Sequence, residues 1–148
     1  MGIKTPKWVP LKEDIDNILE TSNERELFVV GQIVIERTLE KVIEAKFHIP
    51  KKILDDTRFP MQLKMDLVTE SDLLEEKLRA NIGRINSIRN RYGHRLEPDQ
   101  KSIDNLLSQL NYLETVPENE PEKLDKYRIC VKQTFSELEK MLRNSTKN

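Results

Sequence analysis

The chain has 148 residues, of which 36% are hydrophobic and 34% are charged, and its formal net charge at pH 7 is −1. This length suits one compact domain, so we treat residues 1–148 as a single domain whose ends, 1–10 and 144–148, fray. The single cysteine, Cys130, excludes an intramolecular disulfide and a zinc site built on cysteines, and it favours a reducing, cytoplasmic location. No apolar run approaches the length of a membrane span, and the opening "MGIKTPKWVPLKEDID" lacks the apolar core of a signal peptide.

The first part of the chain predicts a short helix followed by a long one. Apolar residues at helical spacing predict the short helix over about residues 11–20. The long pattern covers residues 21–47. Its start carries two overlapping capping-box spacings, Thr21 with Glu24 and Asn23 with Glu26. Its apolar residues spread over more than one face, so this helix is either central in a bundle or part of a subunit interface.

The middle of the chain predicts a loop and two further helices. Residues 51–60 read as a loop or a short helical turn, and residues 61–68 as a short helix. A second long helix is predicted over residues 71–94, where Leu74, Leu78, Ile82, Ile85 and Tyr92 recur at steps of three, four and seven. Gly93 can end or bend this helix.

The last third predicts two helices joined by a polar segment. Apolar spacing indicates a helix in residues 99–116, and a second one over about 122–143. Between them "PENEP" (117–121) carries two prolines and reads as a connection. No strand-type alternation persists anywhere. The sequence therefore predicts an all-α, up-and-down bundle of four to five helices.

Positive charge is concentrated in the second long helix. Residues 77–95 hold six bases and no acid, so this window carries +6 while the rest of the chain carries −7. A basic stripe on an otherwise acidic protein favours a polyanionic partner, because the field is focused in one place. The alternative is a solvated face whose arginines pair with acids elsewhere in the bundle.

The stripe ends in "RNRYGHR" (89–95), which holds the candidate catalytic residues. This stretch resembles a motif of the HEPN superfamily, whose catalytic members cleave RNA without a metal. That reaction needs a group that takes the 2′-hydroxyl proton and a cation that stabilises the phosphate. Histidine titrates near neutrality, so His94 suits the first role. The planar fork of Arg89 matches phosphate oxygens, and Asn90 can orient Arg89 or donate to the phosphate. Tyr92 can in principle stack on a base, although its spacing favours core packing.

The remaining arginines near the motif are candidates for binding the RNA backbone: Arg84, Arg91 and Arg95. This chemistry requires no metal and no cofactor. Residues 89 and 94 are about 140° apart on an ideal helix, so one straight helix cannot bring them together. Either Gly93 allows the helix to bend, or two protomers complete the site. We favour the dimer.

These residues resemble the HEPN superfamily, whose signature is Arg, four to six residues, and His, often with a polar residue after the Arg. Arg89, Asn90 and His94 fit this signature. The stretches "NERELFVVGQIVIERTLEKVIEA" and "LEEKLRANIGRINSIRNRYGH" are similar to helices of the mannitol operon repressor-like branch, with Gly93 where Ala is common. Together these stretches cover roughly a third of the chain, and helix context strengthens a motif that is weak alone.

The resemblance implies a helical domain that dimerises and brings two Arg-x4-His motifs together across a cleft. Catalytic members are metal-independent endoribonucleases of toxin–antitoxin and antiviral defence systems, so an antitoxin or regulatory protein is a further expected partner. Members silenced by a nucleotidyltransferase antitoxin usually carry Tyr two residues after the His. Leu96 occupies that position here, which puts such a partner in doubt.

Three other interpretations remain open. His94 can be a surface histidine at a helix end, where a cation is favourable. The domain can be a catalytically silent regulator that binds nucleic acid or protein, as the repressor-like branch suggests. It can also be a helical interaction subunit whose apolar stripe on residues 27–43 docks onto another chain.

Overall fold

The structure is a computed structural model that describes residues 12–93, 99–114 and 121–145, and every regular element in these ranges is helical. This confirms the all-α fold class. The elements in chain order are η1 (Lys12–Asp14), α1 (Ile15–Ile18), α2 (Glu24–Phe47), α3 (Lys51–Leu54), α4 (Met61–Glu70), α5 (Glu76–Gly93), α6 (Gln100–Ser108) and α7 (Lys123–Ser145). Of the segments predicted to fray, the described residues 144 and 145 lie in α7; the others, and most of the 117–121 connection, lie outside the described residues.

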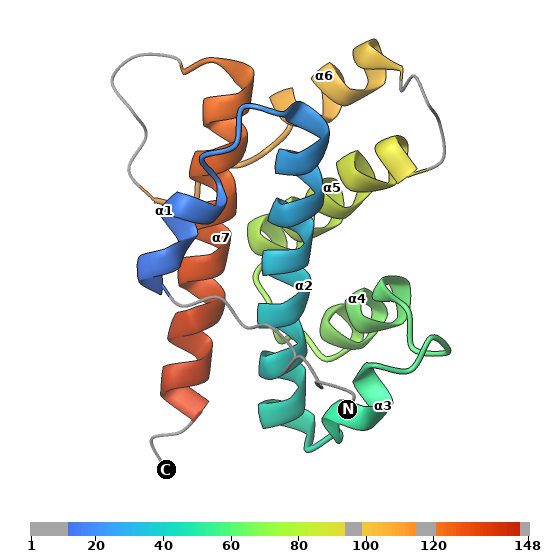
Figure 1. The fold of residues 1–148 in the computed structure, drawn as a ribbon. Helices are drawn as coiled ribbons and strands as arrows, with labels where there is room; N and C mark the ends of the chain where they lie inside the picture. Colours follow the sequence, from blue (N-terminus) through green and yellow to red (C-terminus); the bar gives the residue numbers. More distant parts are fainter. Residues whose placement is uncertain (1–11, 94–98, 115–120, 146–148) are drawn as a thin grey trace, which may run out of the picture.

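The three long helices alternate in direction along the chain. Contacts from Tyr92 to Glu24 and from Gln32 to Asn86 show that α5 runs antiparallel to α2. The first turns of α2 and α7 lie at the same end of the bundle, so α7 runs parallel to α2 (Figure 1). The short helices α3 and α4 pack beside the second half of α2, and α6 lies near the far end of α5 (Figure 1).

The helix α2 is central in the bundle, which is one of the two roles that its broad apolar surface predicts. It contacts α7, α5, α4 and α3. Most of its apolar side chains are therefore covered by the rest of the chain: Leu27, Phe28, Val34, Ile35, Leu39, Val42 and Ile43 are buried. Burial of apolar area of this kind is the main favourable term in folding. Most of the stripe on residues 27–43 is therefore core and is not free for another chain.

A glycine sets the close approach of α2 and α7. A Cβ on Gly31 would overlap the hydroxyl of Tyr127 and lie 2.8 Å from its Cε2. Tyr127 is fully buried, its ring packs edge-on against Phe28 with 4.8 Å between centroids, and its hydroxyl donates to the Phe28 carbonyl at 3.2 Å. Only glycine leaves room for this tyrosine.

Helix ends follow local rules. Asn23 is the N-cap of α2 and accepts from the Glu26 backbone N–H at 2.9 Å, so the second of the two predicted cap spacings is the one used. α2 ends at Phe47, and the C-cap residue His48 takes a left-handed conformation with φ 55°. α4 ends in a Schellman arrangement, with Asp72 at φ 53° and a bond from Leu73 N–H to the Val68 carbonyl at 3.2 Å.

Two predicted helices are shorter in the structure. The helix predicted over 71–94 begins at Glu76, because the Schellman turn occupies the preceding residues. The helix predicted in 99–116 ends at Ser108 because tertiary hydrogen bonds replace helical ones beyond it. The buried Asn81 side chain accepts from Asn111 N–H and donates to its carbonyl, both at 2.8 Å. This amide fixes the segment after α6 against the middle of α5.

Candidate functional site

The apolar face of α5 positions the predicted motif. Leu78, Ile82, Ile85 and Tyr92 are buried along this helix. Arg89 lies four residues after Ile85 and three before Tyr92, so it occupies a position in the same stripe. The sequence pattern stepped seven residues from Ile85 to Tyr92 and passed over it. The buried Ile88 also falls between these two residues, directly before Arg89.

Arg89 is half-buried, and its Nε is buried with no hydrogen-bond partner among the described residues. Leaving a buried donor unpaired costs about 1–3 kcal/mol. A carboxylate or phosphate oxygen is the acceptor that a guanidinium fork matches best. Because the Nε itself is buried, an anion from solvent can meet only the accessible part of the half-buried Arg89 side chain.

Tyr92 anchors the end of α5 and is not available to a base. Its hydroxyl donates to Glu24 Oε2 at 2.6 Å, and its ring lies 5.3 Å from Phe28 and 5.5 Å from the guanidinium of Arg25. Burial, together with the Glu24 carboxylate, raises the pKa of Tyr92 well above its usual value. The packing role favoured by its spacing is confirmed.

The other described candidates lie on different faces of α5. Asn90 and Arg91 are exposed. At 100° per residue, Arg91 lies about 160° around the helix from Arg89. Arg84 donates through Nη1 to the Gln109 carbonyl at 2.8 Å, at the end of α6. One copy of α5 thus brings Arg89 close to neither Arg91 nor Arg84, and Arg84 already has a structural partner.

His94 and Arg95 lie outside the described residues, so the geometry of the Arg89–His94 pair stays a prediction. α5 itself extends through Gly93. Cys130 is fully buried, and burial raises the pKa of its thiol to about 11. This is opposite to the shift that activates a nucleophilic cysteine.

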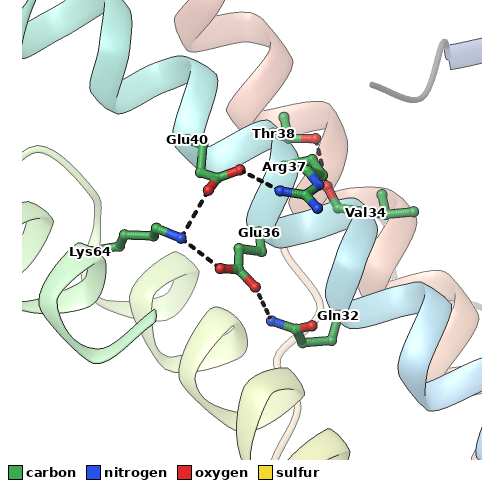
Figure 2. A network of polar contacts seen from close by, with 7 residues as sticks. All are labelled: Gln32, Val34, Glu36, Arg37, Thr38, Glu40 and Lys64. Carbon is green, nitrogen blue, oxygen red and sulfur yellow. Dashed lines mark hydrogen bonds and ion pairs between the residues drawn. The ribbon is translucent and has the colours of Figure 1, made fainter. Parts of the chain in front are cut away.

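A buried polar cluster lies between α2 and α4 and was not predicted from the sequence (Figure 2). Lys64, on α4, is only 3% exposed, and its Nζ lies 2.6 Å from Glu36 Oε2 and 2.8 Å from Glu40 Oε2. Arg37 also pairs with Glu40, at 3.2 Å. Gln32 donates to Glu36 at 2.8 Å and reaches Asn86 on α5 at 3.4 Å. The cluster therefore joins three helices.

Burial by itself would raise the pKa of Glu36, but hydrogen bonds from Lys64 and Gln32 hold it below its ordinary value. The cluster borders a pocket of about 300 Å³ that also includes Asp55, Asp56 and Phe59. A signal for the cluster was present in the sequence. Lys64 follows Met61 by three residues and precedes Val68 by four, which puts it on the buried face of α4.

Within the described ranges, no group of three or more His, Cys, Asp or Glu side chains is placed to hold a metal ion. No helix in the same ranges is both long and apolar enough to cross a membrane. Comparisons of the chain with family models, curated proteins and solved structures found no match.

Proposed function

We propose that the protein is a metal-independent endoribonuclease of the HEPN type, active as a homodimer. In this proposal His94 is the acid/base, Arg89 binds the scissile phosphate and Asn90 assists it. Arg84, Arg91 and Arg95 hold the RNA backbone. The observation that carries the proposal is Arg89, a permanent cation that stands half-buried in the apolar stripe of α5, near the end of the basic segment.

The proposed reaction is an internal transfer at phosphorus. The imidazole of His94 takes the proton of the 2′-hydroxyl, whose oxygen attacks the adjacent phosphate. Arg89 stabilises the charge on the phosphate oxygens in the transition state. The bond to the 5′-oxygen breaks, and that oxygen receives a proton from an imidazolium. The products carry a 2′,3′-cyclic phosphate and a 5′-hydroxyl.

In this proposal the site lies between two protomers, as the spacing of Arg89 and His94 favours. These two residues are about 140° apart on an ideal helix, so a single straight helix does not bring them together. In a symmetric dimer the partner supplies a second copy of the same motif across the cleft. The site then spans two protomers, and RNA is the substrate. We place the enzyme in the cytoplasm, in a toxin or antiviral setting with a regulatory protein partner.

The alternative is a catalytically silent regulator, and one feature of α5 favours it. Lys77, Arg84 and Arg91 follow one another at steps of seven residues, so they form a row on the face away from Arg89. Such a row can bind a phosphate backbone without any contribution from Arg89 or His94.

The first experiment is cleavage of a mixed RNA pool in EDTA by the parent protein, His94→Ala and Arg89→Leu. Arg79→Leu, the same substitution on the same helix, is the matched control. We expect the parent and Arg79→Leu to cleave, and the other two variants to lose at least about 100-fold in rate. Equal cleavage by His94→Ala and the parent would contradict the mechanism.

Thermal unfolding of the same variants separates a functional role from a structural one. Leu continues the apolar stripe and removes a buried donor that has no partner among the described residues, so Arg89→Leu should gain about 1 kcal/mol of stability while losing activity. A large loss of stability would mean that Arg89 is a structural residue with a partner.

RNA binding distinguishes the alternative. If neither the parent nor any variant cleaves RNA, binding of single-stranded RNA is measured as a function of salt. The double substitution Lys77→Gln/Arg91→Gln should make the slope of log K against log salt concentration shallower by about 0.7 for each phosphate that the variant no longer neutralises. Arg89→Leu should then bind as the parent does. That combination would favour the regulator over the enzyme.

A further inference from the structure

A groove runs between α1 and the first half of α2, away from the predicted catalytic residues. Its volume is about 670 Å³, and its lining is Asn17, Ile18, Glu20, Thr21, Glu26, Val30 and Ile33. It is larger than the pocket beside Lys64, at about 300 Å³, and the one beside Ile53, at about 460 Å³.

The groove has an apolar floor and an acidic rim. Ile18 on α1 is half-buried, and so are Val30 and Ile33 on α2, although most other apolar residues of α2 are fully covered by the bundle. The exposed Glu20 and Glu26 stand at the edge, and Glu26 accepts a hydrogen bond from Thr21 at 3.2 Å. A floor and rim of this kind fit a short segment that carries both apolar and cationic side chains.

We propose that residues 1–11 of the same chain occupy this groove, with Trp8 on the floor. The segment reads MGIKTPKWVPL and contains the only tryptophan of the chain, two lysines and no acid. Its apolar side chains match the floor, and Lys4 and Lys7 match the rim. This inference is independent of the proposed function.

Chain connectivity supports an occupant from the same molecule. Residue 11 leads directly into η1, and η1 leads into α1, which forms one wall of the groove. Trp8 is four residues from Lys12, and an extended chain spans about 3.3–3.6 Å per residue. Four residues therefore reach about 13 Å, which is comparable to the length of η1 and α1 together.

The proline content of the segment suits an extended occupant. Pro6 and Pro10 disfavour a helix and preset extended backbone, which lowers the entropy lost on docking. Docking would also cover Ile18 and hold α1, a single turn of helix, against α2.

The single tryptophan makes the proposal directly testable by fluorescence of the full chain. We expect the emission of Trp8 to be blue-shifted and its quenching by acrylamide to be several-fold weaker than in the protein unfolded in denaturant. Val30→Lys places a cation on the floor, so it should shift the emission to longer wavelength and restore quenching. Leu63→Lys, at an exposed apolar residue of α4, is the matched control and should leave both unchanged.

A second variant tests the same contact without altering the bundle. Lys4→Glu/Lys7→Glu should expose Trp8 to acrylamide. In the parent, salt should screen the contact between the lysines and the acidic rim and so increase the quenching of Trp8. In the variant, salt should leave the quenching unchanged. Helix content and the melting temperature of each variant exclude unfolding as the cause of a change.

Three outcomes would overturn the proposal. The first is quenching of Trp8 in the parent as strong as in the unfolded protein. The second is protection of Trp8 that persists in both the groove variant and the lysine variant. The third is protection that falls on dilution, in step with dissociation by light scattering, because a second copy then covers the tryptophan.

Discussion

The helix α2 buries two faces by opposite means. Towards α7 it presents Phe28 and Gly31, which receive the ring of Tyr127. Towards α4 it presents Glu36 and Glu40, which receive the ammonium group of Lys64. One contact is apolar and close-packed, and the other is ionic, although both lie on the same helix.

The two contacts contribute in different ways. Apolar burial stabilises the fold in proportion to the area removed from water, and this stabilisation does not depend on the orientation of the contacting groups. A buried ion pair contributes little net stability, because desolvation offsets attraction, but its geometry is demanding. The α7 contact therefore stabilises the bundle, whereas the Lys64 cluster specifies where α4 docks.

The largest effect should come from breaking the ionic contact on one side only. Lys64→Met leaves Glu36 and Glu40 without their shared cation, and we expect a loss of about 3 kcal/mol in the free energy of unfolding measured with urea. Lys52→Met, at an exposed residue of α3, is the control and should change stability by less than about 0.5 kcal/mol.

A second substitution should then recover stability. Lys64→Met/Glu40→Leu removes the more buried carboxylate and leaves Glu36 with Gln32 and partial access to water. The double variant should be more stable than Lys64→Met alone. If it is less stable, the cluster is a source of stability in its own right and the distinction between the two faces fails.

The apolar contact should respond to one methyl group. Gly31→Ala adds a Cβ that overlaps the Tyr127 hydroxyl, and we expect a net loss of about 1–2 kcal/mol despite the better helix propensity of alanine. The control is Gly83→Ala on α5, where a Cβ meets nothing within 4 Å. It should gain about 0.5–1 kcal/mol. Equal melting temperatures for the two variants would mean that α2 and α7 are free to move apart.

The smallest effect is a pH dependence of the ionic contact. The pKa of Glu36 is lowered in the fold, so its stabilising contribution is complete above the ordinary value of about 4.5 and disappears as pH falls through the lower folded value. Glu36→Gln should therefore be less stable than the parent at pH 7, and the difference should shrink below about pH 4.5. The charged groups near this carboxylate are Lys64, Arg37 and Glu40. If the stability difference between Glu36→Gln and the parent stayed constant down to about pH 3, it would argue that Glu36 does not contribute through its charged form.

The two faces also differ in how well the sequence predicts them. The apolar stripes of α2, α5 and α7 follow helical periodicity, so the all-α fold, the long helices and the packing role of Tyr92 could be predicted. Helix ends held by tertiary bonds could not, and α6 stops early because Asn81 binds Asn111 from a distant helix. No periodicity carries that information.

At the candidate site, the neighbouring residue types could be predicted without a structure: a cation, an amide and a histidine at the end of a basic segment. That identity depends only on chain order. The fold adds that the buried Nε of Arg89 has no hydrogen-bond partner among the described residues, that Arg84 binds the end of α6, and that Lys64 joins α4 to α2. Burial and pairing are set by what packs against each residue, and those neighbours come from parts of the chain far away in sequence.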